Sequence, residues 1–372
     1  MNQNFTFYGT QCNALEVEEF IKHLIYTNEK AETSGRRKTP LCIWGLHGIG
    51  KTQLVEEFAK QNQYKWQYIA PAQFEEMGDL LGMPHLSTDA QGKESTQMAP
   101  PEWVPRQEGP GILLIDDVNR ADDRILRGIM QLLQNYELSS WKLPAYWHIV
   151  LTANPDGGDY SVTPMDFAML TRMMHITMEF DVKRWAWWAE KNQIDPRVIA
   201  FVLTYPETVQ GERTTPRTLT QFAESIASIK DLKANLPLVK MMADACLDSN
   251  TVINFVSFIN NDLSRLIAPE EILQSKDFEK EVYEPIKAMV LQQVKRVDIL
   301  SIICTRLVNI LLLEKVQLDT AELENIKKFL KMDFIPNDLR LIVMKDIVSS
   351  DKPKLKKVLQ DPELGRLYLQ NA

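Results

Sequence analysis

The sequence predicts an α/β protein in which a parallel sheet, covered by helices on both faces, is followed by all-helical regions. Short apolar runs alternate with segments of helical periodicity in the first half of the chain, strand signals stop after Asp181, and helical periodicity continues beyond it. The chain has 372 residues, so more than one hydrophobic core is expected. We expect an α/β core over residues 1–190, a helical lid over residues 191–265 and a helical C-terminal region over residues 266–372.

The first expected element is a helix that begins after Asn13. Asn13 and Glu16 have the spacing of a capping box, and Val17, Ile21 and Leu24 then share one face. The basic residues 33–38 are expected to form a solvated loop before a buried strand, with a phosphate or nucleic-acid contact as the alternative.

Five apolar runs are expected to form a five-stranded parallel sheet, because apolar strands separated by helices belong to sheets that are buried on both faces. These runs are Leu41–Trp44, Trp66–Ala70, Ile112–Ile115, Ile149–Thr152 and Ile176–Phe180. After them, helices are expected at residues 183–191, 196–203, 216–229, 236–247 and 251–263, and further helices over residues 269–369. Pro196 and Pro216 suit first-turn positions.

The composition narrows the class of protein. A net charge of −8 argues against a surface built to wrap nucleic acid, although it leaves room for a local basic channel in an assembled ring. The four cysteines are far apart, which favours reduced thiols over zinc ligands or disulfides. Since the sequence shows neither an export signal nor a membrane-spanning run, we expect a soluble, cytoplasmic protein without a membrane partner.

The segment Gly45–Thr52 fits the phosphate-binding pattern G-x-x-x-x-G-K-[ST], and it lies after an apolar strand and before a helix. Glycines let consecutive backbone N–H groups turn toward phosphate oxygens, Lys51 reaches the β/γ oxygens, and the Thr52 hydroxyl binds Mg²⁺. We therefore expect ATP with Mg²⁺ to be bound by Gly45, Leu46, His47, Gly48, Ile49, Gly50, Lys51, Thr52 and Gln53.

A carboxylate pair follows the run Ile112–Ile115. We expect Asp116 to hold Mg²⁺ through water and Asp117 to polarise the attacking water. Most ATPases of this kind have Glu at the second position. Asp is one methylene shorter, and a misplacement of about 1 Å can slow a reaction about a hundredfold.

Three further polar residues fall where this chemistry needs them. Asn154 ends an apolar strand and is expected to position water and the γ-phosphate. Arg172 precedes the last strand and would offer a cation to the nucleotide of a neighbouring subunit. Arg217 opens a helix in the second region and would reach back to the phosphates. All three, with Lys51 and Asp117, are predicted catalytic residues.

These motifs together resemble the MoxR-like AAA+ ATPases, a family of P-loop NTPases, over about residues 5–230. Residues 115–121 resemble the family's "DE-hydrophobic-NRA" signature, and residues 76–82 its "DL-x-G" segment. Residues 152–155 are similar to its sensor 1, and Pro216-Arg217 to its sensor 2. Arg172 matches the arginine of "LDRF", where Thr171 replaces the usual Asp. Tyr8 and Gly9 resemble the segment that lies against the adenine.

The resemblance implies an AAA+ core that binds nucleotide at the subunit interfaces of a hexameric or similar ring, with Arg172 supplied in trans. It also implies remodelling or maturation of a protein substrate, commonly one with a von Willebrand factor A-type domain. Residues 82–105 and 138–146 look like the inserts that face the ring pore.

Two other functions fit the sequence. One is the motor subunit of a nucleic-acid-processing complex, such as a restriction or mobile-element system; the acidic charge argues against it. The other is a nucleotide-binding scaffold with slow turnover, which the aspartate at position 117 suggests.

Overall fold

The computed structural model describes residues 6, 8–88, 90–157, 162–261, 263, 266–291 and 295–371. The chain divides into two compact units, Met1–Asp181 and Val182–Ala372. The first unit contains the sheet, and the second is helical.

The sheet of the first unit has six parallel strands in the order β1-β10-β2-β9-β6-β3. Their bounds are Thr10–Cys12 (β1), Met174–Met178 (β10), Leu41–Trp44 (β2), Trp147–Ala153 (β9), Gly111–Ile115 (β6) and Lys65–Ile69 (β3). All five predicted strands are confirmed, but the predicted number of five is wrong, because β1 adds a sixth strand at one edge. This strand has three residues, and Thr10 and Gln11 are exposed, so it carries no apolar run that a sequence pattern detects.

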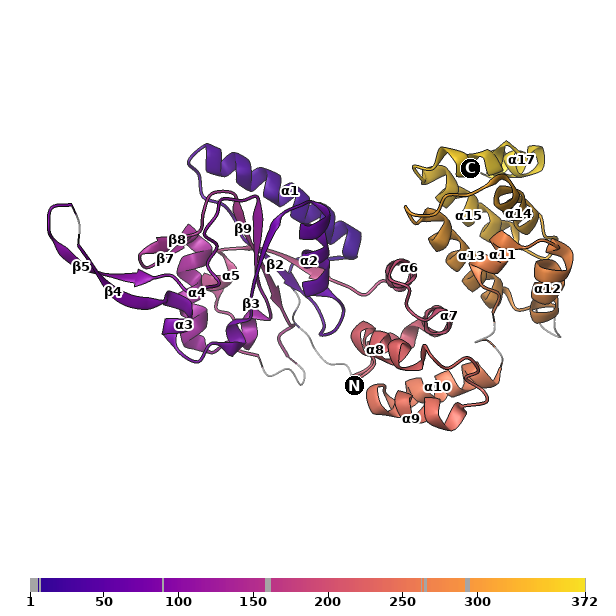
Figure 1. Ribbon diagram of the computed structural model, residues 1–372, viewed down its shortest axis with the longest axis horizontal. Helices are drawn as coiled ribbons and strands as arrows, with labels where there is room; N and C mark the ends of the chain where they lie inside the picture. Colours follow the sequence, from indigo (N-terminus) through magenta and orange to yellow (C-terminus); the bar gives the residue numbers. More distant parts are fainter. Residues whose placement is uncertain are drawn as a thin grey trace. The chain divides into compact units, whose positions relative to one another are not determined.

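Alternate residues of the central strands bury into opposite faces of the sheet. Leu41 and Ile43 pack with α1 (Ala14–Thr33) and α2 (Lys51–Gln61), whereas Cys42 and Trp44 pack on the face that α4 (Asp123–Asn135) covers. The predicted cover of both faces is therefore confirmed (Figure 1). The capping box of α1 is also present, since Asn13 Oδ1 accepts from the Glu16 amide at 3.2 Å.

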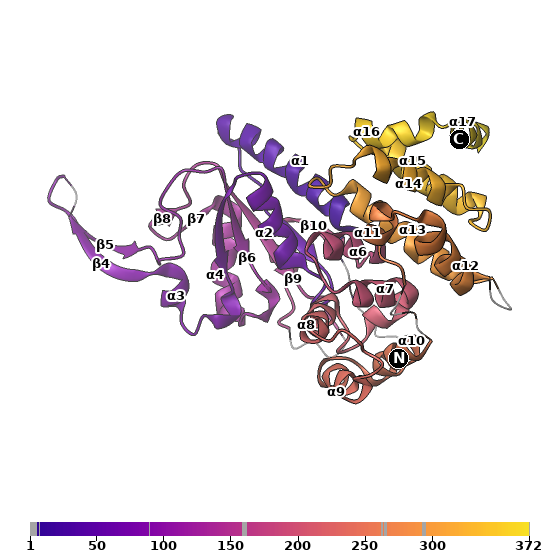
Figure 2. The same ribbon diagram turned by 45° about the vertical axis from the view of Figure 1, so that its right-hand side comes forward.

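Two hairpins leave this sheet. β4 (Met83–Thr88) pairs antiparallel with β5 (Glu94–Ala99), and this hairpin projects away from the sheet in both views (Figures 1 and 2). β7 (Glu137–Leu138) pairs with β8 (Trp141–Lys142). For the first segment the residues themselves predict only a proline-containing loop. A two-stranded hairpin tolerates Pro84 because both of its strands are edge strands. The short helical elements of this unit are η1 (Pro71–Gln73), α3 (Met77–Leu81), η2 (Val118–Arg120) and α5 (Phe167–Leu170).

The second unit is built from helices, as the periodicity predicts. The helices are α6 (Val182–Lys191), α7 (Pro196–Thr204), α8 (Pro216–Ile226), α9 (Leu236–Cys246), α10 (Ser249–Asn260), α11 (Pro269–Gln274), α12 (Glu284–Val290), α13 (Val297–Leu312), α14 (Thr320–Leu330), α15 (Asn337–Ser349), α16 (Pro353–Lys356) and α17 (Pro362–Asn371). Shorter turns are η3 (Pro206–Gln210), η5 (Glu279–Tyr283) and η6 (Lys357–Gln360). Pro196 and Pro216 are the first residues of α7 and α8, where the missing N–H costs nothing. Of the helices in the described ranges, none has the length and apolar character needed to cross a bilayer.

Candidate nucleotide-binding site

The carboxyl ends of three neighbouring strands bring the predicted site residues together. Gly45 follows β2, Asp116 follows β6 and Asn154 follows β9, and these strands are adjacent in the sheet. Parallel strands direct their carboxyl ends to the same edge, which is where open α/β sheets bind ligands.

The loop between β2 and α2 has the backbone that a phosphate cradle requires. Gly48 and Gly50 have φ values of 71° and 97°, and a Cβ on Gly45 would lie 2.8 Å from the Met178 carbonyl oxygen. Glycine is therefore required at Gly45 for close packing and is favoured at Gly48 and Gly50 by their torsions. Since α2 begins at Lys51, its N-terminal amides and positive dipole end face this loop.

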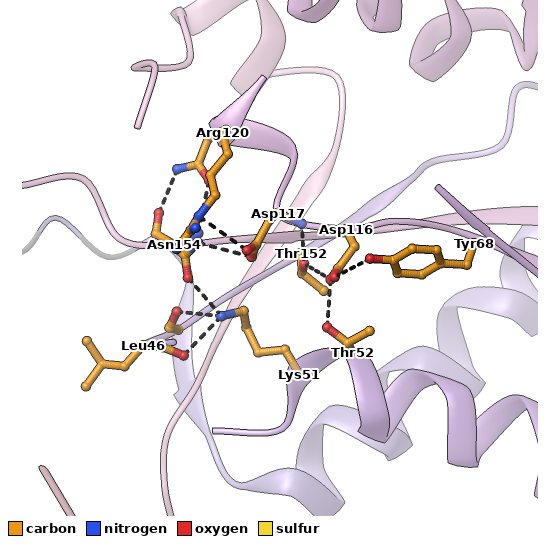
Figure 3. A network of polar contacts seen from close by, with 11 residues as sticks. Leu46, Lys51, Thr52, Tyr68, Asp116, Asp117, Arg120, Thr152 and Asn154 are labelled. Atoms are coloured by element: carbon orange, nitrogen blue, oxygen red, sulfur yellow. Dashed lines mark hydrogen bonds and ion pairs between the residues drawn. The ribbon is translucent and has the colours of Figure 1, made fainter. Parts of the chain in front are cut away.

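Lys51 is buried, with 6% of its surface exposed. Its ammonium group donates to the carbonyl oxygens of Gly45 at 2.8 Å and Leu46 at 3.0 Å, and to Asn154 Oδ1 at 3.2 Å (Figure 3). These three acceptors hold the amine at the mouth of the loop, close to where the phosphates of a nucleotide are expected.

Asp116 accepts three hydroxyl hydrogen bonds. Thr52 Oγ1 and Thr152 Oγ1 donate to Asp116 Oδ1 at 2.7 and 2.6 Å, and the Tyr68 hydroxyl donates to Oδ2 at 3.1 Å (Figure 3). Burial and the adjacent Asp116 raise the pKa of Tyr68 to about 12, so the phenol stays a proton donor. Hydrogen bonds to both oxygens thus fix the orientation of the Asp116 carboxylate.

This set of oxygen atoms suits Mg²⁺. Magnesium is bound through hard oxygen ligands and usually keeps several waters, with one or two carboxylates and the substrate phosphates. Thr52 and Asp116 supply a hydroxyl and a carboxylate that already touch. In the described ranges no cluster of three or more His, Cys, Asp or Glu side chains forms a separate metal centre.

Asp117 lies beside the cradle in a left-handed backbone conformation, with φ 47° and ψ 44°. Its amide donates to Thr152 Oγ1 at 2.8 Å, and Asn154 Nδ2 donates to Asp117 Oδ1 at 3.0 Å. Arg120 Nε forms an ion pair with Asp117 Oδ2 at 3.3 Å. Both carboxylate oxygens of the predicted general base therefore have partners.

A buried amide pair holds Asn154 in place. Asn119 Nδ2 donates to the Asn154 carbonyl oxygen at 2.8 Å, and the Asn154 amide donates back to Asn119 Oδ1 at 3.1 Å. Both residues are fully buried. This closed pair ties the strand end that carries Asn154 to the turn that follows the two aspartates.

Sequence reasoning assigned no role to four residues that the structure places in this network: Tyr68, Asn119, Arg120 and Thr152. Asn119 and Arg120 belong to the run that follows the aspartate pair, and Thr152 lies two residues before Asn154. Because they adjoin predicted motifs, the sequence could have indicated that these three residues belong to the site. Tyr68 gave no such indication, because it ends an unrelated strand.

Tyr8 and Gly9 lie next to β2 and β10. The Tyr8 ring is 4.6 Å from the Trp44 ring, and its hydroxyl donates to Asp156 Oδ2 at 3.4 Å. Burial, reinforced by Asp156, raises the pKa of Tyr8. A Cβ on Gly9 would lie 2.0 Å from the His175 carbonyl oxygen, so only glycine fits there. The predicted contact of this segment with adenine stays a prediction.

The remaining predicted residues are not part of the polar network described above. Gln53 is exposed on α2, where its side chain donates to Glu57 at 3.0 Å, and His47 lies within the loop. Arg172 precedes β10 and therefore lies at the amino edge of the sheet, opposite the phosphate loop. Arg217 is exposed in the first turn of α8, in the second unit. The roles of Arg172 and Arg217 stay predictions.

Residues 40–173 match a family model described as "AAA domain (dynein-related subfamily)". A search of curated proteins finds no match. Among solved structures, the Thermotoga maritima RuvB Holliday junction branch migration motor aligns at 15% identity and a TM-score of 0.36, covering 73% of this chain and 86% of that chain. A mutant of T. maritima RuvB aligns at 14% identity and a TM-score of 0.37, covering 76% of this chain and 87% of that chain. The first unit thus has an α/β AAA+ fold.

Proposed function

We propose that this chain, whose residues 40–173 form an AAA domain, is a magnesium-dependent ATPase that works as a ring and remodels or matures a protein partner. The single observation that supports hydrolysis is the continuous polar network from Lys51 through Asn154 to Asp117 and from Thr52 to Asp116. It places a cation, a hydroxyl, two carboxylates and an amide around one phosphate cradle, which is the set of groups that phosphoryl transfer to water requires.

Each side chain has a task that follows from its contacts. The loop amides and Lys51 bind and orient the phosphates, and Thr52 and Asp116 would hold Mg²⁺. When bound, the metal neutralises charge on the phosphate oxygens. Asp117 accepts a proton from the attacking water, or orients it. Asn154, which touches both Lys51 and Asp117, keeps that water in line with the γ-phosphate.

The position of Arg172 supports assembly into a ring. Arg172 lies at the amino edge of the sheet, opposite the phosphate loop of its own chain, so we assign it to the nucleotide of a neighbouring subunit. Arg217, which belongs to the second unit, would contact the same phosphates. The motif resemblance to MoxR-like ATPases supports a protein substrate, commonly with a von Willebrand factor A-type domain, in the cytoplasm. The four free cysteines fit that reducing compartment.

The first test measures ATP hydrolysis against protein concentration. We expect the rate per chain to rise with concentration, and Arg172→Ala to lower it by about a hundredfold or more while ATP still binds. Lys51→Ala should abolish both binding and hydrolysis. A rate per chain that is independent of concentration and is unchanged by Arg172→Ala would contradict both the ring assembly and the role of Arg172 in trans.

One observation favours slow turnover as a second candidate function. Asp117 has both carboxylate oxygens engaged, by Asn154 and by Arg120, and it is shorter than glutamate. A chain of this kind would act as a nucleotide-dependent scaffold. Tight ATP binding with negligible phosphate release, together with a gain of turnover in Asp117→Glu, would favour the scaffold over the fast motor.

A further inference from the structure

A polar hollow lies in the first unit, away from the phosphate loop. It has a volume of about 360 Å³ and is lined by Arg37, Lys38, Leu133, Gln134, Thr171 and Arg172. Arg37 and Lys38 come from the loop before β2, and Thr171 and Arg172 from the turn before β10. Since these two strands are hydrogen-bonded neighbours in parallel register, the two segments meet at one place on the amino edge of the sheet.

The hollow has more positive charge than its surroundings neutralise. Lys38 is paired with Glu32 at 2.8 Å and lies 4.6 Å from the centre of the Tyr136 ring, with only 8% of its side chain exposed. Burial lowers the pKa of Lys38 in spite of that carboxylate. One acidic residue therefore offsets one of the three cations.

Among the residues that the structure describes, neither arginine has such a partner. Arg172 donates to Gln134 Oε1 and to the Ala168 carbonyl oxygen, both of them neutral acceptors. Arg37 is exposed, and in the ranges that the structure describes it forms no ion pair. Thr171 lines the hollow at the position where MoxR-like ATPases carry aspartate, so no carboxylate is added there. Two guanidinium groups, which suit phosphate oxygens by shape and charge, thus share one open hollow.

The hollow cannot serve the phosphate loop of its own chain. Gly45 follows the carboxyl end of β2, whereas Lys38 precedes its amino end, so four strand residues, or about 13 Å, separate the two edges. Any phosphate that reaches the hollow must come from another molecule. On α5, whose Ala168 carbonyl oxygen accepts from Arg172, the Phe167 side chain is 85% exposed.

We propose that Arg37 acts together with Arg172 as a second trans arginine, and that the hollow receives the terminal phosphates of the nucleotide held by a second copy of this chain. The inference rests on the proposed function and extends it. Arg172 is fixed by its two neutral acceptors, and Arg37 would contact the phosphate from the neighbouring segment before β2. Two guanidinium groups spread the developing negative charge better than one.

Arg36 provides a matched control, because it is the adjacent residue, is also exposed, and does not line the hollow. In the full-length chain we expect Arg37→Ala to lower kcat for ATP hydrolysis on the order of ten- to a hundredfold. Arg36→Ala should leave kcat unchanged, and Arg37→Lys should recover part of the loss. Affinity for a fluorescent ATP analogue and the thermal unfolding midpoint should not change in any of the three.

Mixing variants tests whether Arg37 acts in trans. Arg37→Ala and Lys51→Ala chains are each slow alone, but together they form interfaces in which an intact phosphate loop meets an intact Arg37. With random pairing, about a quarter of the sites regain activity. Slow hydrolysis by Arg37→Ala without regain in the mixture would overturn the inference, because it places the effect within one subunit.

The remaining outcomes separate this inference from the proposed function. If Arg172→Ala is slow and regains activity with Lys51→Ala, while Arg37→Ala matches Arg36→Ala, the ring stands and the role of Arg37 is refuted. If Arg172→Ala is fully active, the proposed ring with an arginine supplied in trans is contradicted, and the inference about Arg37 that rests on it is contradicted too. If Arg37→Ala keeps full hydrolysis and loses binding to duplex DNA, the hollow serves nucleic-acid phosphates and the inference is again refuted.

Discussion

Asp116 is held by three hydroxyl groups, and only Thr52 among them belongs to the phosphate-binding motif. The other two, Thr152 and Tyr68, come from the ends of the neighbouring strands β9 and β3. They leave the carboxylate little freedom to rotate, which keeps one oxygen toward Thr52 and the predicted metal site. Groups that orient a metal ligand in this way commonly change metal affinity or activity ten- to a hundredfold when they are removed, by order of magnitude.

Tyr68→Phe should therefore raise the Mg²⁺ concentration needed for half-maximal hydrolysis by about tenfold, because Asp116 loses one of its three donors. Affinity for ATP without Mg²⁺ should not change, since Tyr68 does not touch the phosphate loop. Tyr64→Phe is the control: Tyr64 precedes the same strand and packs against Phe58, 6.1 Å between ring centres. Equal Mg²⁺ dependence in the two variants would contradict the orienting role of Tyr68.

His148 is a second residue whose behaviour follows from its surroundings. It is 2% exposed on β9, and neither ring nitrogen has a hydrogen-bond partner in the described part of the chain. Burial, assisted by the charge of Lys38 and opposed by that of Glu32, lowers its pKa to about 4. The neutral ring is the form that the folded chain accommodates.

Acid should consequently destabilise the first unit through His148. The folded-state pKa lies below the unfolded-state value of 6.5, so the unfolded chain binds the proton first as pH falls below 6.5. The stability that depends on the neutral His148 ring is fully present above pH 6.5. About 2 kcal/mol of the free energy of unfolding is lost by about pH 5. Urea unfolding at pH 8 and pH 5 measures it, with His148→Leu as the comparison. The hypothesis fails if the variant loses as much stability between the two pH values as the parent.

At the scale of elements, α13 is the most deeply buried helix of the second unit. Its buried residues occur all round the helix and include a charged one, Arg306, which is 4% exposed. Arg306 Nε donates to Glu190 Oε1 of α6 at 2.7 Å. Burial raises the pKa of Glu190, while Arg306 acts in the opposite direction. Separating the two side chains would leave a buried charge without a partner. The ion pair therefore fixes how α6 packs on α13.

Arg306→Met should destabilise the second unit by about 3–5 kcal/mol, because it leaves Glu190 buried without a partner. The double variant Glu190→Leu/Arg306→Met should recover most of that loss, since an apolar pair of similar volume needs no compensation. The exposed pair Lys240–Asp244 on α9 gives the control, and Asp244→Ala should have no measurable effect. Denaturant unfolding of the parent and the three variants measures these differences in the free energy of unfolding. A double variant as unstable as Arg306→Met would refute the explanation.

At the scale of the whole molecule, each unit has its own apolar core. The first has the sheet with helices on both faces, and the second has α13 among α6, α7, α11, α12 and α15. The phosphate loop, both aspartates and Asn154 belong entirely to the first unit, and Arg217 belongs to the second. We therefore expect nucleotide binding to depend on the first unit and full turnover to depend on both units.

Residues 1–181 expressed alone should fold and bind ATP, because the whole cradle and its core lie within them. Their rate of hydrolysis should fall below that of the full-length chain, since the predicted contribution of Arg217 is missing. Circular dichroism during heating and titration with a fluorescent ATP analogue measure folding and affinity. Lys51→Ala in the same fragment should bind no nucleotide. A fragment that folds but cannot bind ATP would show that the second unit completes the cradle.

The sequence by itself determined the five apolar strands and the helix that begins after Asn13. It also determined the positions of Lys51 and Thr52 at the start of a helix and of Asp116 and Asn154 after strand ends. Each of these depends on local patterns, because burial on both faces, capping and glycine torsions act over a few residues. The order of motifs along the chain then placed the site, since parallel strands share one carboxyl edge.

Only the tertiary structure decided the features that depend on packing between distant segments. β1 pairs at an exposed edge with too few apolar residues to be detected, and Tyr68 reaches Asp116 only because β3 lies beside β6. Arg37 and Arg172 meet only because β2 and β10 are neighbours. No local pattern contains such a pair, because the free energy that brings the segments together comes from burying the whole sheet rather than from either segment.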